Sequence, residues 1–100
     1  MEIITKTEGN KATMKISGWL DTQTAPQLGE ALSGLEDSIT SLVFDFTNLE
    51  YISSAGLRQV IVAYKKMAPK DGFKIINVSD EVYDVFSLTG FDSKIDIQKK

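Results

Sequence analysis

The most informative stretch of the chain is Asn48-Leu49-Glu50-Tyr51-Ile52-Ser53-Ser54-Ala55-Gly56-Leu57. The nearly continuous apolar run of residues 42–46 precedes it, as expected for a strand that is covered on both faces. After it, apolar residues recur at a spacing of three and four as far as Met67, which predicts an amphipathic helix over about 54–68. The two serines therefore lie where a buried strand gives way to the first turn of a helix.

This position suits a phosphate group. The first backbone N–H groups of a helix have no partner inside it, and the aligned peptide dipoles leave partial positive charge there. The small side chains of Ala55 and Gly56 would let another protein's active site approach the hydroxyls. A purely structural role is also open, because serine is a good N-cap residue and contributes ~1 kcal/mol over alanine. With two adjacent serines, one can cap the helix while the other stays free.

The other patterns predict an alternating chain. Glu8-Gly9-Asn10 reads as a hairpin turn between strands that start near Ile3 and Ala12. The later elements are a helix over 22–35 with Pro26 in its first turn, strand 41–46, helix 54–68, strand 73–78, a helix from Ser79 to Gly90 with a buried stripe of Val82, Val85, Phe86 and Leu88, and a short strand at 95–97. The order β-β-α-β-α-β-α-β predicts one α/β domain over residues 1–100, a mixed β-sheet flanked by helices.

Composition narrows the function. The chain has no cysteine and no histidine, so neither a zinc site nor a Ser-His-Asp arrangement can be built, and we expect no enzyme, metal or cofactor. The chain has a net charge of -3 and a single arginine, so it lacks the basic surface that is typical of a nucleic-acid-binding protein. No apolar run of about 18 residues and no signal segment is present, so we expect a cytoplasmic protein that does not bind membranes.

Three segments carry a family resemblance. Gly18-Trp19-Leu20-Asp21, residues 42–57 and Leu88-Thr89-Gly90-Phe91 resemble the successive signatures of STAS domains, the anti-sigma factor antagonists of bacteria. The match spans nearly the whole chain in the right order, and its central motif is the specific one. The resemblance implies a compact domain with a sheet flanked by helices, a serine that an anti-sigma serine kinase phosphorylates, and control of transcription by partner switching.

The resemblance also implies residue roles. Ser54 occupies the position of the phosphorylated serine, two residues before the glycine of the Gly-Leu pair. The preceding position is often Asp in the family and is Ser53 here, which makes Ser53 the alternative acceptor. Asp21 matches an acidic position near the acceptor, although it could equally cap a helix from Thr22 onward, and Asp45 is expected to pin the loop after its strand. The implied partner surface contains Asp21, Thr22, Ser53, Ser54, Ala55, Gly56 and Arg58.

The implied partners are an anti-sigma factor that is also a serine protein kinase, and a serine phosphatase. The chain itself is expected to be a monomer or a weak dimer. Two alternatives stay open: a STAS scaffold that works without phosphorylation in a signalling or transporter-related assembly, and a module that holds a small molecule or lipid in a core pocket. An apolar cavity inside the domain would favour the second alternative.

Overall fold

The chain begins with a hairpin that forms one edge of the sheet. Strands β1 (Glu2–Glu8) and β2 (Lys11–Leu20) pair antiparallel around Gly9 and Asn10, which confirms the predicted turn. Gly9 has a φ of +59°, a conformation that glycine adopts at no steric cost. Along β2, three buried side chains alternate with more exposed ones, so this strand has the expected period of two: Ala12, Met14 and Ile16.

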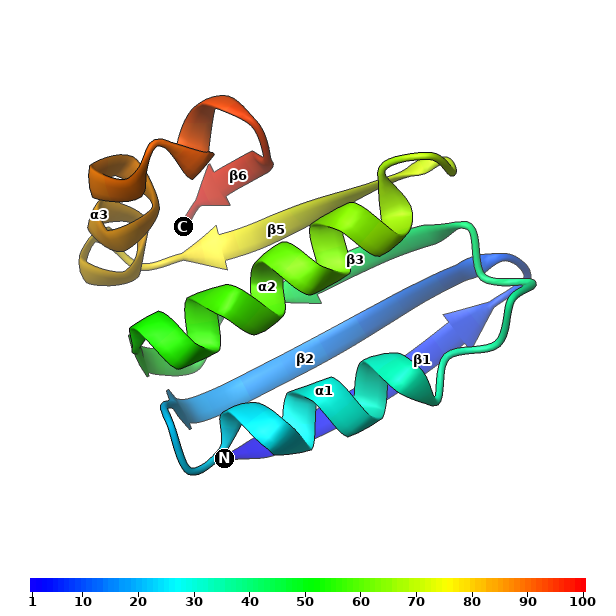
Figure 1. Ribbon diagram of the computed structural model, residues 1–100, viewed down its shortest axis with the longest axis horizontal. Helices are drawn as coiled ribbons and strands as arrows, with labels where there is room; N and C mark the ends of the chain where they lie inside the picture. The colour runs from blue at the N-terminus through cyan, green and yellow to red at the C-terminus, as the bar shows by residue number, and fades with distance from the viewer.

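The other strands join this hairpin in a mixed sheet (Figure 1). The computed structural model describes residues 1–100 and contains, after the hairpin, α1 (Ala25–Ser33), β3 (Ser41–Asp45), β4 (Leu49–Ile52), α2 (Ser54–Met67), β5 (Gly72–Val78), α3 (Asp80–Thr89), the short 3-10 helix η1 (Phe91–Ser93) and β6 (Asp96–Lys99). The strand order is β1-β2-β3-β5-β6, and every pair except β1 with β2 is parallel. The mixed sheet is confirmed.

One strand was not predicted. β4 follows β3 after a three-residue turn and pairs with the far end of β2, where Leu20 lies opposite Ile52. β3 pairs only with the first half of β2, Lys11 to Lys15, so β3 and β4 both pair with the long strand β2. The element order is therefore β-β-α-β-β-α-β-α-β, with η1 before the last strand. The residues just before the serine pair consequently belong to the sheet.

The helices lie on one side of the sheet and enclose the core. Figure 1 shows α1 and α2 laid across one face, with α3 beside the end of β5. The core consists entirely of hydrophobic side chains, and no polar or charged residue is buried. Phe44 at the centre of β3 is fully buried and meets Phe73 edge-on at 4.9 Å between ring centroids. The central strands and the helix from 54 thus form one hydrophobic unit.

Two helix details differ from the sequence expectations. α1 begins at Ala25 rather than at residue 22, because the Asp21 carboxylate holds the preceding residues in a turn. Leu88 was assigned to the buried stripe of α3, but it is 88% exposed. Val82 and Phe86 are the buried residues of that helix, and Gly90 ends it with a φ of +80°.

Candidate functional site

The site is built on the junction between β4 and α2. The N–H of Ser53 donates to the carbonyl of Leu20 at 2.9 Å, so it extends the β2–β4 pairing by one residue. Ser53 has extended backbone angles, and its Oγ accepts a hydrogen bond from the N–H of Gly56 at 3.2 Å. This is the geometry of a helix N-cap. The predicted capping role of Ser53 is therefore present in the structure.

Ser54 is the first residue of α2, and its side chain is exposed. The Ser54 hydroxyl makes no hydrogen bond in the structure, in contrast to that of Ser53, so it is free to react. Ser53 already provides the acceptor for the Gly56 N–H, while the N–H groups of Ser54 and Ala55 have no partner inside the helix. The two serines thus separate into a structural hydroxyl and an accessible one.

Gly56 has a different role from the one expected. It is buried, and a β-carbon built on it would lie 2.6 Å from the carbonyl oxygen of Leu20. Atoms do not approach this closely, so only glycine allows the first turn of α2 to press against the end of β2. Gly56 is therefore inaccessible in this structure. It sets the position of Ser53 and Ser54 relative to the loop that follows β2.

That loop carries Asp21. Its Oδ1 accepts hydrogen bonds from the N–H groups of Gln23 at 2.9 Å and Thr24 at 3.0 Å, and from the hydroxyl of Thr24. These bonds hold residues 22–24 in the turn that leads into α1, whose N-cap residue is Thr24, so Asp21 stabilises the turn before the helix and does not cap the helix itself. The N–H of Thr24 is the main cause that holds the pKa of Asp21 below its ordinary value, with smaller help from the Thr24 hydroxyl and the Gln23 N–H. The carboxylate is charged at neutral pH.

Both elements meet at Leu20. This residue bonds to Ser53 through its carbonyl and directly precedes Asp21, so the structure brings the Asp21 loop beside the start of α2. Of the expected partner surface, Thr22, Ser54 and Arg58 are exposed. Asp21, Ser53 and Ala55 are partly buried, and only Gly56 is inaccessible. The structure thus brings together the segments that the sequence predicts for the partner surface, with Gly56 buried beneath them.

Asp45 fixes the chain just before β4. Its Oδ1 accepts hydrogen bonds from the N–H of Thr47 at 3.0 Å, from the Thr47 hydroxyl and from the side-chain amide of Asn77 at 3.1 Å. Partial burial raises the pKa of Asp45, but these bonds and the charge of Lys15 outweigh it, so the pKa lies below its ordinary value. Asp45 pins the loop, as expected, and ties it to β5.

Two aromatic residues lie beside the site and were not predicted to belong to it. Trp19 is 57% exposed and Tyr51 is 45% exposed, and their ring centroids lie 5.4 Å apart across β2 and β4. The available signal was their position, since Trp19 precedes Leu20-Asp21 and Tyr51 precedes Ile52-Ser53. Large aromatic side chains in such exposed places are typical of protein interfaces.

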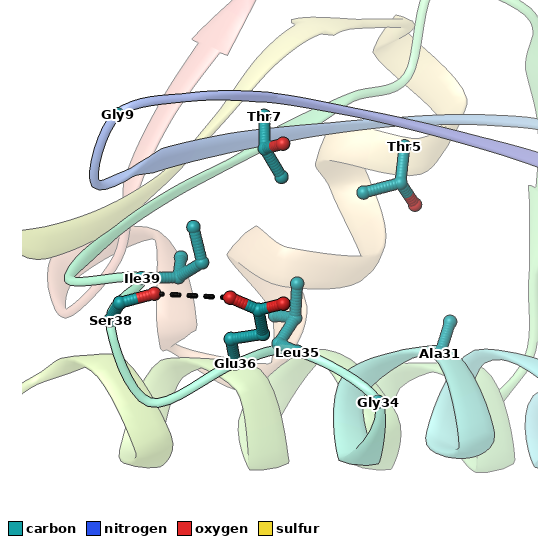
Figure 2. Close-up of a pocket in the computed structure, with 9 residues that line it drawn as sticks. All are labelled: Thr5, Thr7, Gly9, Ala31, Gly34, Leu35, Glu36, Ser38 and Ile39. Carbon is teal, nitrogen blue, oxygen red and sulfur yellow. Dashed lines mark hydrogen bonds between the residues drawn. The ribbon is translucent and has the colours of Figure 1, made fainter.

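A shallow groove lies at the opposite end of the sheet from Ser54. It has a volume of about 330 Å³ and opens between β1 and the loop after α1 (Figure 2). Thr5 and Thr7 face Glu36 and Ser38 across it, and Ser38 donates a hydrogen bond to Glu36. This largely polar surface groove is not the apolar core cavity that would favour a lipid-binding module. None of the three helices is long enough and apolar enough to cross a membrane.

Comparison with known proteins identifies the family. The family model described as STAS domain matches residues 2–100, so the chain belongs to the STAS domain family. The chain is 33% identical over 97 residues to a protein of Bacillus subtilis (strain 168) named anti-sigma-B factor antagonist. That alignment covers 95% of this chain and 88% of the relative.

Solved structures show the same fold. An anti-sigma factor antagonist from Mycobacterium paratuberculosis superimposes with a TM-score of 0.88 at 25% sequence identity, covering 99% of this chain and 86% of that one. The Bacillus cell fate determinant SpoIIAA, solved in its phosphorylated form, superimposes with a TM-score of 0.68 at 17% identity. The superposition covers 96% of this chain and 90% of the SpoIIAA chain. At that identity the likeness to SpoIIAA concerns the fold alone.

Proposed function

We propose that this STAS domain is an anti-sigma factor antagonist, and that phosphorylation of Ser54 makes it exchange partners. The observation that carries the proposal is the division of labour at the start of α2. Ser53 is occupied as the helix cap, whereas the hydroxyl of Ser54 is exposed and free. The relative in Bacillus subtilis is named anti-sigma-B factor antagonist, which supports the antagonist function.

In the unmodified state, the surface around Ser54 would bind an anti-sigma factor and so release the sigma factor that it holds. The Asp21 loop and the beginning of α2 would form this surface together, because Leu20 holds them side by side. Thr22, Ala55 and Arg58 would contribute at its edge. The anti-sigma factor would also be the serine kinase, and a serine phosphatase would reset the switch. All these steps would take place in the bacterial cytoplasm.

The kinase would supply ATP, a metal ion and a base, and this domain would supply only the acceptor. The Oγ of Ser54 would form the new bond to the γ-phosphorus, the bond to ADP would break, and the hydroxyl proton would pass to the base of the kinase. The phosphate then adds about -1.5 to -2 charge at neutral pH. At a helix N-terminus this charge is tolerated or mildly stabilising, so the domain stays folded.

At an interface the same charge is costly. It must be stripped of water or placed opposite like charge, which costs several kcal/mol. Since each ~1.4 kcal/mol is a tenfold change in affinity, phosphorylation would weaken anti-sigma factor binding by about 100-fold or more. The negative charge of Asp21 in the adjoining loop adds to this effect. The switch is therefore electrostatic and needs no large conformational change.

The experiment is mass mapping after incubation with ATP and the anti-sigma serine kinase of the same organism. We expect a gain of about 80 Da, the mass of one phosphoryl group, on the fragment that contains Ser54. The Ser54→Ala protein should gain nothing and stay bound to the anti-sigma factor, whereas Ser54→Asp should bind more weakly. Phosphate on Ser53 would overturn the assignment of the acceptor. An unmodified native protein would favour the scaffold that works without phosphorylation.

A further inference from the structure

Ser54 and the single arginine of the chain, Arg58, lie on the same exposed face of α2. Four residues of this helix are exposed, and they follow one another at spacings of four, four and three: Ser54, Arg58, Val62 and Lys65. They form one stripe that faces solvent. Ser54 and Arg58 are therefore consecutive members of the same stripe, one helical turn apart.

This spacing brings the two side chains within reach. Residues four apart on a helix have β-carbons about 5–6 Å from each other. Side chains in a helix also lean toward its N-terminus, so an arginine at position 58 can reach back over the turn that begins at Ser54. A residue N-terminal to Ser54 would lean away from it. The order serine first, arginine second is thus the favourable one.

Arg58 has no anionic partner in the structure. The one ion pair of the molecule joins Lys99 to Asp80. The sequence of α2 contains no Asp or Glu, so no carboxylate of the same helix can pair with Arg58. An exposed, unpaired guanidinium one helical turn from a free hydroxyl can donate hydrogen bonds to a phosphate installed on that hydroxyl.

We propose that Arg58 binds the phosphate of phosphorylated Ser54 within the same helix; the inference rests on the proposed modification of Ser54. The planar guanidinium donates two parallel N–H bonds to phosphate oxygens, a geometry that lysine cannot reproduce. The modification then has two effects on the partner surface. It adds negative charge at Ser54, and it withdraws the positive charge of Arg58 from any partner that used it.

The test installs phosphoserine at position 54 during synthesis of the full chain, so that no kinase is needed. Native Arg58, Arg58→Lys and Arg58→Gln are each prepared with serine and with phosphoserine. The Nε–H signal of Arg58 in the NMR spectrum and the thermal midpoint are recorded at pH 7. The matched control is Lys65→Gln, which removes a charge from the same stripe two members further along.

We expect the Nε–H signal to move on phosphorylation and the midpoint to rise by about 2 to 4 °C, the size of a favourable surface ion pair in a domain of this length. Arg58→Gln should lose this rise, Arg58→Lys should keep part of it, and Lys65→Gln should keep it in full. An unmoved Nε–H signal, or an equal rise in the Arg58→Gln protein, would overturn the proposal. A kinase that ignores Ser54 would instead contradict the proposed function, because this test does not use a kinase.

Discussion

The carbonyl oxygen of Leu20 would lie only 2.6 Å from a β-carbon at position 56, so it leaves no room for a side chain on Gly56. Gly56 is therefore the point at which the helix that carries Ser54 is pressed against the strand that leads to Asp21. The contact involves backbone on one side, so it cannot be relieved by rotating a side chain. Two segments far apart in the sequence, the end of β2 with the Asp21 loop and the start of α2, meet closely at this glycine.

Replacing Gly56 with alanine should destabilise the domain by ~1 to 3 kcal/mol, the usual cost of overpacking. Helix propensity alone would favour alanine by ~1 kcal/mol, so the sign of the change decides which effect is larger. Urea unfolding measures it. The matched control is Gly34→Ala, since a β-carbon there meets ordinary contacts at 3.5 Å, and its stability should change by less than about 0.5 kcal/mol. A stabilised Gly56→Ala protein would mean that α2 sits further from β2.

Replacing Ser53 with alanine should cost about 1 kcal/mol, because the N–H of Gly56 loses its acceptor. Ser54→Ala should leave the stability within about 0.5 kcal/mol, since the Ser54 hydroxyl holds nothing in place. Thermal or urea unfolding of the two variants gives the comparison. The Ser53→Ala protein should still be phosphorylated. If both variants lost equal stability, the division of the serines into cap and acceptor would be wrong.

Truncating Phe44 to alanine should cost ~3 to 5 kcal/mol, because this fully buried ring touches Phe73 and the rest of the core. Such a loss is a large part of the stability of a small domain. Leu88→Ala is the control, since Leu88 is 88% exposed and its truncation should change little. The two melting temperatures should differ widely. Similar values would contradict either the burial of β3 or the exposure of the last turn of α3.

Stability should fall below about pH 4, and Asp45 should account for part of the loss. Its pKa in the folded protein lies below the ordinary value, so its contribution is complete above the unfolded pKa of about 3.9 and disappears as the pH falls through the folded value. Asp45→Asn should flatten this part of the curve, because asparagine does not titrate. Urea midpoints between pH 2 and 7 would show it. An unchanged slope would mean that Asp45 has an ordinary pKa.

Asp21 allows its two roles to be separated. Asp21→Asn keeps an oxygen for the N–H groups of Gln23 and Thr24 but removes the charge, whereas Asp21→Ala removes both. We expect both variants to bind the anti-sigma factor more weakly and only the alanine variant to lose stability. Calorimetric titration and thermal unfolding distinguish the outcomes. If neither variant changed the binding, Asp21 would serve the fold alone.

Most of the helices and strands follow from local patterns in the sequence. Alternation along β2, the apolar run at 42–46 and the helical spacing after Leu57 identify three of them, because side-chain burial has a different period in strands and helices. Ser53 and Ser79 each cap a helix through local hydrogen bonds, which depend only on residues within three positions. Local rules therefore sufficed for the capping role of Ser53.

β4, the role of Gly56 and the exposure of Leu88 follow from the tertiary arrangement. β4 has two exposed residues between two buried ones, a spacing of three that does not match the strand period of two, and it forms because β2 offers an unpaired edge. Gly56 matters because of a carbonyl 36 residues away in the chain. Leu88 fits the spacing of its helix, yet it is left 88% exposed in the folded domain. Each depends on atoms distant in sequence, which local periodicity cannot report.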